Sequence, residues 1–214
     1  MPIRARSTRR VLGYADAVLD RFPKTLRRLL YAGGTRQDRL RDPHAVVEAL
    51  RIAPGAIVAD LGPGYGHFTL RLARAVDPGG IVFALDASAG TLEELRRAAD
   101  ARGITTLRMV RVARDRLEIP EPVDLLFVSA TYHHLRDRIG YFSAAVAFLR
   151  PGGRVAILEA LGTGILARWM GFHASPPGTV IDEMERAGYR LVETHDLVPG
   201  YLFGIFQVRE SGHR

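Results

Sequence analysis

The residues best suited to chemistry lie in a glycine-rich stretch that follows a short apolar run. Residues 58–66 read VADLGPGYG, so an acidic residue, Asp60, stands two positions before a Gly-x-Gly-x-Gly spacing. Glycines in a strand-to-helix turn allow positive φ and let the backbone approach a ligand at the helix N-terminus. A dinucleotide-binding turn would have the spacing Gly-x-Gly-x-x-Gly, but position 67 is His67. A carboxylate beside this turn suits the ammonium group of a ligand better than a pyrophosphate.

A second carboxylate, Asp86, ends the next apolar run, residues 81–85. At the end of a second strand, a carboxylate can accept hydrogen bonds from both hydroxyls of a ribose. Dinucleotides and other nucleoside cofactors both use such a residue, so Asp86 indicates a nucleoside without choosing between them. The alternative is an ordinary tight turn with surface carboxylates.

Further polar residues follow the fourth apolar run, residues 123–129. Ser129, Tyr132, His133 and His134 gather there. Ligands of open α/β sheets bind beyond the carboxyl ends of the strands, so we expect Tyr132 to contact substrate. We expect His133 or His134 to be catalytic, because a histidine can act as a base near neutral pH. The alternative is that one imidazole caps the next helix or packs below the site. His173, in the loop after the fifth strand, is expected to contact substrate, with helix capping by the neighbouring serine as the alternative.

The elements that must position these residues alternate between strand and helix from residue 42 onward. Asp42 followed by Pro43 predicts a helix start, with the helix running to about residue 51. Pro199 and Gly200 predict a two-residue link that makes the last two strands a hairpin. The alternation predicts a doubly wound, mostly parallel sheet with an antiparallel hairpin at one edge. Strands are expected at 57–59, 81–85, 106–112, 123–129, 154–159, 191–198 and 201–208, and further helices at 67–76, 91–101, 139–149 and 177–187.

The segment of residues 1–41 differs from the rest in charge. It holds eleven basic and three acidic residues, a net charge of +8, whereas residues 42–214 hold 19 basic and 20 acidic residues, a net −1. Its apolar residues recur at helical spacing. We expect a lid, with Tyr14 and Arg39 closing over the site and contacting substrate. The alternatives are an interfacial helix, in which residues 1–32 touch anionic lipid, and a nucleic-acid contact or targeting peptide.

Composition sets the remaining bounds. The length of 214 residues suits one α/β domain, residues 42–214, with the N-terminal segment as an extension. The absence of cysteine excludes disulfides, thiolate metal sites and cysteine nucleophiles, and fits a reducing cytoplasm. No apolar run reaches the roughly 18 residues of a membrane span. The histidines lack the spacing of a metal site, and the nearly neutral body disfavours a nucleic-acid partner.

These motifs resemble those of the class I S-adenosylmethionine-dependent methyltransferases, over roughly residues 42–208. More narrowly, the chain is similar to the small-molecule group that includes the ubiquinone and menaquinone C-methyltransferases. The resemblance rests on DLGPGYG at 60–66, ALD at 84–86, VDLLF at 123–127, HHL at 133–135 and LRPGG at 149–153. It implies a seven-stranded sheet of order 3-2-1-4-5-7-6, in which the hairpin supplies strands six and seven.

The resemblance also implies where the cofactor lies. Asp86 would hold the ribose, and Ala87 would lie along the adenine. Family members often carry an acid after the third strand, where this chain reads VARD at 112–115; Asp115 or the backbone of Ala113 and Arg114 would have to replace it. The methionine end would be held by Asp60, Gly62, Pro63, Gly64, Tyr65 and Gly66, with Ser129 completing the cofactor set.

The expected reaction is methyl transfer to oxygen, nitrogen or carbon of a small molecule. Proximity and in-line geometry supply most of the acceleration, and a base is needed only if the acceptor loses a proton. An RNA methyltransferase is disfavoured, because the chain has no Asn-Pro-Pro-Tyr motif, no cysteine and a single lysine. Two further hypotheses stay open: a phospholipid methyltransferase that uses the basic segment, and a non-catalytic protein that keeps the fold. We expect a cytoplasmic monomer or homodimer, with peripheral membrane contact through residues 1–32 as an alternative.

Overall fold

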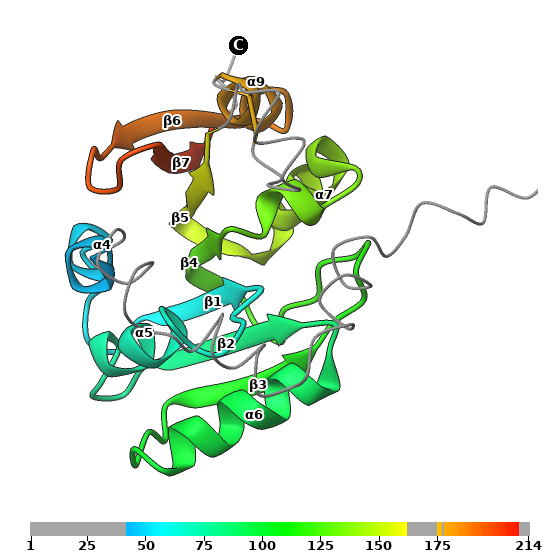
Figure 1. The fold of residues 1–214 in the computed structure, drawn as a ribbon. Helices are drawn as coiled ribbons and strands as arrows, with labels where there is room; N and C mark the ends of the chain where they lie inside the picture. Colours follow the sequence, from blue (N-terminus) through cyan, green and yellow to red (C-terminus); the bar gives the residue numbers. More distant parts are fainter. Residues whose placement is uncertain (1–41, 162–174, 177, 210–214) are drawn as a thin grey trace, which may run out of the picture.

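Seven strands form one sheet in the order β3-β2-β1-β4-β5-β7-β6 (Figure 1). The structure, a computed structural model, describes residues 42–161, 175–176 and 178–209 of the chain. β7 is antiparallel to β5 and β6, and the other pairs are parallel. The predicted order and C-terminal hairpin are therefore confirmed. The strands are β1 (Ile57–Leu61), β2 (Ile81–Asp86), β3 (Leu107–Arg111), β4 (Val123–Ser129), β5 (Leu149–Ala160), β6 (Tyr189–Thr194) and β7 (Tyr201–Val208).

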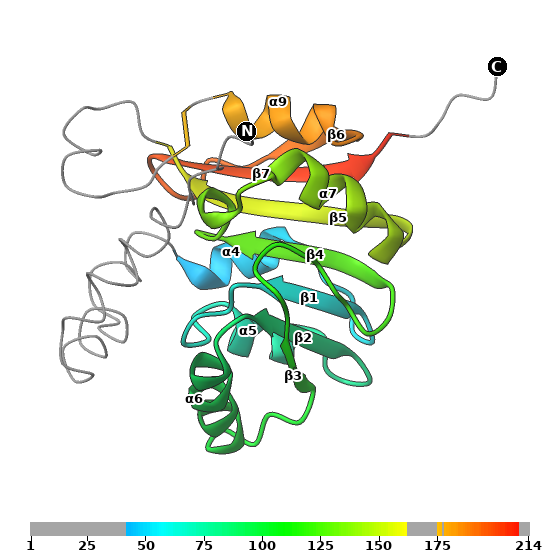
Figure 2. The ribbon, with the colours of Figure 1, turned by 90° about the vertical axis from the view of Figure 1, so that its right-hand side faces the viewer.

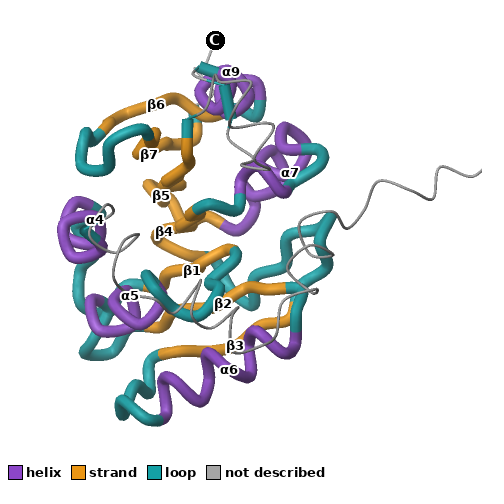
Figure 3. Tube along the Cα trace, in the orientation of Figure 1, coloured by secondary structure: helices purple, strands orange, loops and turns teal. Residues whose placement is uncertain are grey.

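Helices cover both faces of the sheet, with α4 and α5 to its left and α7 to its right in Figure 1. One buried apolar cluster joins the sheet to Val46 of α4, Leu72 of α5 and Leu95 of α6. The other joins it to Phe142 of α7 and Met184 of α9. Because β1 and β4 are buried on both faces, their sequences are almost continuously apolar. The helices, coloured purple in Figure 3, are α4 (Pro43–Ala49), α5 (Thr69–Ala75), α6 (Ala89–Asp100), α7 (Arg138–Ala145) and α9 (Thr179–Arg186), with short 3₁₀ helices η1 (Tyr132–His134) and η2 (Val146–Phe148).

Local sequence explains where several helices begin. The Asp42 side chain accepts hydrogen bonds from the backbone amides of His44 and Ala45, both at 3.2 Å, which confirms the predicted start of α4. Ser88 caps α6 in the same way, so this helix begins two residues before the predicted position. α9 begins after Gly178, which has φ 84° and no side-chain cap. The alternative role of a neighbouring serine as its cap is therefore wrong.

Two predicted boundaries are wrong for reasons of strand register. The link between β6 and β7 covers residues 195–200 rather than two residues, because β6 ends at Thr194. The amide of Tyr201 donates to the carbonyl of Val198 and closes a turn there. β5 begins at Leu149 instead of 154, because Leu149 already pairs with Val123 before a register shift. The predicted Pro-Gly-Gly turn thus forms an irregularity inside a strand.

The parallel strands deliver their carboxyl ends to one edge of the sheet, and Figure 2 shows them side by side along their length. Leu61 of β1 lies opposite both Leu85 of β2 and Val128 of β4. The segments that follow these strands therefore emerge together, and they contain the residues selected from the sequence. No helix in the described part of the chain combines the length and apolar character needed to cross a bilayer.

Candidate functional site

The turn after β1 combines tight packing with one open position. Gly62, Gly64 and Gly66 have φ angles of 76°, 52° and 87°, which favour glycine. A Cβ atom on Gly62 would lie 2.1 Å from the Thr131 hydroxyl oxygen, and one on Gly66 would lie 2.5 Å from Leu95 Cδ1. A Cβ atom on Gly64 would meet no described atom beyond its chain neighbours within 4 Å. The outer glycines are thus fixed by packing, and the middle one leaves room for a ligand against the backbone.

Asp60 lies behind this turn with its carboxylate out of solvent. Its exposed fraction is 2%, and its Oδ2 accepts a hydrogen bond of 2.6 Å from the Thr69 hydroxyl. The pKa of Asp60 is raised from 3.8 to about 7, chiefly by burial, against the lowering effect of the Thr69 bond and with a smaller raising effect of the nearby Asp86. Asp60 has no cationic partner among the described residues. An ammonium group at the open side of the turn would supply that missing charge.

Asp86, at the end of β2, is held in place by the residues that follow it. Its Oδ1 accepts a hydrogen bond of 2.7 Å from the Ser88 amide. The carbonyl of Ala87 accepts a hydrogen bond of 3.4 Å from Arg111 of β3. These contacts fix the carboxylate and the chain beside it, where the ribose and adenine are expected.

The segment expected to meet the adenine begins directly after β3. The amide of Val112 donates to the Asp86 carbonyl at 3.1 Å, so this segment starts beside the ribose position. Ala113, Arg114 and Asp115 are exposed. Their backbone and side chains therefore lie at the surface next to the end of β2.

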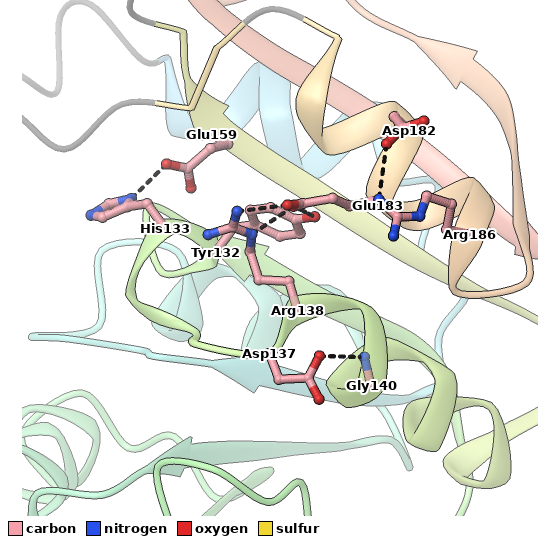
Figure 4. Close-up of polar contacts among 9 residues, drawn as sticks. All are labelled: Tyr132, His133, Asp137, Arg138, Gly140, Glu159, Asp182, Glu183 and Arg186. Atoms are coloured by element: carbon pink, nitrogen blue, oxygen red, sulfur yellow. Dashed lines mark hydrogen bonds and ion pairs between the residues drawn. The ribbon is translucent and has the colours of Figure 1, made fainter. Parts of the chain in front are cut away.

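The two histidines after β4 differ in their surroundings. Nδ1 of His133 lies 2.5 Å from Oε1 of Glu159, at the end of β5 (Figure 4). The His133 side chain is 16% exposed and that of Glu159 is fully buried. The His134 ring, 4.0 Å from that of His133 between centroids, belongs to an exposed residue. The structure thus joins one of the two candidates to a buried carboxylate.

Glu159 was missed by reasoning from sequence. The signal was present, because a single acid ends the apolar run VAIL of residues 155–158. Its Oε2 has no hydrogen-bond partner among the described residues. A buried carboxylate that ends a parallel strand at the ligand edge is a candidate for function.

Tyr132, expected to contact substrate, is instead buried. Its hydroxyl donates a hydrogen bond of 2.7 Å to Oε2 of Glu183 in α9. Arg138 holds the same carboxylate through two bonds of 2.5 and 2.6 Å (Figure 4). Burial, and then the bond to Glu183, raise the pKa of Tyr132 above its usual range. The geometry assigns Tyr132 to holding η1 against α9.

The remaining candidates have varied surroundings. Ser129 is half-buried, and its carbonyl accepts a hydrogen bond of 3.1 Å from the Thr131 hydroxyl. Pro63 is buried and Tyr65 is 36% exposed. The described residues contain no group of three or more His, Asp or Glu side chains that could hold a metal. Three expected substrate contacts lie outside the described residues: Tyr14, Arg39 and His173.

The comparison with protein families matches a region that contains most of the candidate residues described above. Residues 58–153 match the model of a methyltransferase domain. An uncharacterized 37.1 kDa protein in transposon TN4556 of Streptomyces fradiae is 30% identical over 114 residues, which are 53% of this chain and 33% of that protein. The matched region thus spans one third of the length of that relative.

Solved structures share the fold. An S-adenosylmethionine-dependent methyltransferase from Aquifex aeolicus has a TM-score of 0.69 at 21% identity, with 87% of this chain and 98% of that one covered. The CcbJ methyltransferase of Streptomyces caelestis has a TM-score of 0.65 at 19% identity, with 79% and 90% covered. The [4+2]-cyclase SpnF has a TM-score of 0.65 at 19% identity, with 76% and 62% covered. The fold therefore also occurs in a protein named for a different reaction.

The family match includes the glycine turn, Asp86 and both histidines. It falls on a sheet whose order is that of the solved methyltransferases. Residues 58–153 thus match a methyltransferase domain, and the described chain shares its fold with solved S-adenosylmethionine-dependent methyltransferases.

Proposed function

We propose that the chain transfers a methyl group from S-adenosylmethionine to oxygen, nitrogen or carbon of a small molecule. The cofactor supplies an electrophilic methyl group on a positively charged sulfur. The observation that carries the proposal is Asp60, a buried carboxylate with a pKa raised to about 7 behind a turn with room at Gly64. Such a carboxylate is poorly solvated until a cationic group reaches it, which suits the amino group of the cofactor.

The residues at the carboxyl ends of the strands contact successive parts of the cofactor, as the resemblance implies. Asp60 holds the amino group, and the backbone around Gly64 lies against the methionine end. Asp86 accepts hydrogen bonds from the ribose hydroxyls, because its carboxylate is already oriented by Ser88. Ala87 and the backbone of Ala113 and Arg114 lie along the adenine, and Ser129 completes the set.

The acceptor side is formed by the segment after β4, with His133 or His134 as the base where a proton must leave. A small acceptor is favoured over nucleic acid because residues 42–214 carry a net charge of −1 and offer no excess of positive charge for phosphates. Within this proposal, residues 1–41 form a lid that brings Tyr14 and Arg39 to the acceptor, with His173 beside them. The resemblance of the sequence motifs to the quinone C-methyltransferase group favours an acceptor about as large as a quinone.

Calorimetric titration of the full chain with S-adenosylmethionine tests the core of the proposal. We expect one cofactor per chain, with S-adenosylhomocysteine competing for the same site. Absence of binding at millimolar cofactor would overturn the proposal. A transfer assay with isotopically labelled methyl groups over phenols, amines, quinones and phospholipids then tests the acceptor class. Sedimentation of the full chain with anionic and with neutral liposomes tests the lid, because binding to anionic liposomes alone would favour an interfacial helix.

A further inference from the structure

We propose that His133, held by Glu159, takes the proton of the acceptor, and that the acceptor is therefore a hydroxyl compound methylated on oxygen. The inference rests on the proposed function and narrows it in two respects. It selects one of two adjacent histidines, and it selects oxygen among three acceptor atoms. It depends on contacts among β4, β5 and α9 that join residues distant in the sequence.

The contact with Glu159 determines which ring nitrogen of His133 is basic. Within this proposal Glu159 is ionised, so its carboxylate only accepts hydrogen bonds and Nδ1 of His133, 2.5 Å away, carries the proton. In the neutral imidazole the other nitrogen, Nε2, then has the lone pair. Nε2 lies on the far side of the ring from Glu159 and is the atom that receives a proton from an acceptor.

The burial of Glu159 favours that proton transfer. Its side chain is fully buried, and the second carboxylate oxygen has no partner among the described residues. A buried negative charge is unfavourable unless an opposite charge lies against it. The imidazolium that forms when His133 gains a proton supplies that charge at hydrogen-bond distance. The pair is therefore stabilised most at the moment when the acceptor loses its proton.

The residues before His133 hold the ring at the cofactor edge. Thr131 fills the space in front of Gly62, so η1 begins against the glycine turn. The next residue, Tyr132, is fixed from α9 by Glu183, which Arg138 holds through two hydrogen bonds. Three consecutive residues are thus each held by a different part of the fold, as Figure 4 shows for the second and third. A side chain positioned in this way loses little conformational entropy when it acts at a reacting atom.

A hydroxyl is the acceptor that most needs this arrangement. A neutral amine attacks through its own lone pair and can lose its proton to water afterwards, whereas a hydroxyl is a weak nucleophile until its proton leaves. In the balance of the transfer, the oxygen–carbon bond forms as the carbon–sulfur bond breaks. The electron pair of the broken bond stays on sulfur, and the hydroxyl proton goes to Nε2 of His133. The charge of the former sulfonium is thus conserved as imidazolium beside Glu159.

A kinetic comparison of two phenols tests the proton transfer. The variant is His133→Asn, and the matched control is His195→Asn. His195 also contacts a glutamate, Glu193, at 3.2 Å. Its ring packs on Phe203, on the face of the sheet that α4, α5 and α6 cover. With a phenol that is neutral at the assay pH, we expect His133→Asn to lower kcat by about 10²- to 10⁴-fold. With a nitro-substituted phenol that is already ionised, we expect a loss of less than about tenfold, because no proton must leave. Equal losses for both phenols would overturn the proposal, as would methylation of amines alone.

A measurement without turnover tests the pair itself. The ¹⁵N spectrum of the imidazoles in the cofactor-free full chain, assigned by comparison with His133→Asn, should show the neutral His133 ring protonated on Nδ1. In Glu159→Gln we expect a loss of this tautomer preference, and a ring protonated on Nε2 in the unchanged chain would overturn the proposal. Calorimetry separates the two levels of inference. Failure to bind S-adenosylmethionine refutes the proposed function, whereas binding with full activity of His133→Asn on a neutral phenol refutes the proton transfer alone.

Discussion

Replacing Asp60 by asparagine should make the cofactor-free protein more stable at alkaline pH. Asparagine keeps the size of the side chain and can accept the Thr69 hydrogen bond, but it cannot ionise. The folded-state pKa of Asp60 is raised from 3.8 to about 7, chiefly by burial. Its contribution to stability is therefore fully present below about pH 4 and is lost as the pH rises through 7. The variant does not incur this loss.

The size of the effect follows from the shift of the pKa. A shift from 3.8 to about 7 is about 3 units, and about 1.4 kcal/mol for each unit gives a total loss of about 4 kcal/mol above pH 8. About two fifths of that loss has already occurred at pH 5, where an unfolded chain has released the proton. Between pH 5 and pH 8 the unmodified protein should thus lose roughly 2 to 3 kcal/mol relative to Asp60→Asn. Because Asp60 is only 2% exposed, solvent screening reduces this value little.

Urea unfolding of the cofactor-free proteins at pH 5, 6, 7 and 8 measures this difference. The control is Asp115→Asn, which alters an exposed carboxylate and should leave the pH dependence as it is. The free energy of unfolding of Asp60→Asn should rise relative to the unmodified chain at each step in pH. A difference that stays constant from pH 5 to pH 8 would refute the idea that Asp60 is a neutralised buried acid.

The same ionisation governs cofactor affinity with the opposite consequence. Binding of an ammonium group requires Asp60 to be charged, so affinity should fall up to tenfold for each pH unit below about 7. Calorimetry in buffers of different ionisation enthalpy should detect a proton released on binding near pH 6. In Asp60→Asn the affinity should be weak and nearly independent of pH. An unchanged affinity in the variant would remove Asp60 from the site.

Three further substitutions test separate parts of the edge. Asp86→Ala should weaken S-adenosylmethionine binding about 10- to 100-fold, as expected for hydrogen bonds to a charged group; unchanged calorimetric affinity would exclude Asp86 from the site. Gly62→Ala should lower the free energy of unfolding by about 2 kcal/mol more than Gly152→Ala. The two glycines have nearly the same φ angle, 76° and 77°, but only a Cβ atom on Gly62 would collide with Thr131. Equal losses of stability in the two variants would show that this packing does not matter. Glu183→Gln should destabilise the chain by about 2 kcal/mol in urea unfolding, because a partly buried arginine loses its charged partner; no change would show that this tether contributes little.

The sequence by itself determined the fold class and the glycine-rich turn after β1. The alternation of apolar runs and helical patterns predicted a doubly wound, mostly parallel sheet, because crossover connections between parallel strands have one hand. The strand order itself followed from the resemblance to the class I methyltransferases. The spacing of Gly62, Gly64 and Gly66 indicated a turn with positive φ, since few other residues adopt it. Asp42 marked a helix start for an equally local reason, the hydrogen bonds of its side chain to the next amides. These features depend on neighbours in the chain, which the sequence displays directly.

The tertiary structure alone decided which side chains meet beyond the carboxyl ends of β4 and β5. His133 and Glu159 are 26 residues apart and meet only because Ser129 lies opposite Leu158 in the register of β4 and β5. Tyr132 looked like a ligand contact but is buried, because Glu183 of α9 reaches its hydroxyl. The pKa of Asp60 depends likewise on how completely its surroundings exclude water. Burial and long-range contacts come from packing between elements far apart in the sequence. The spacing of residues along the chain therefore does not predict them.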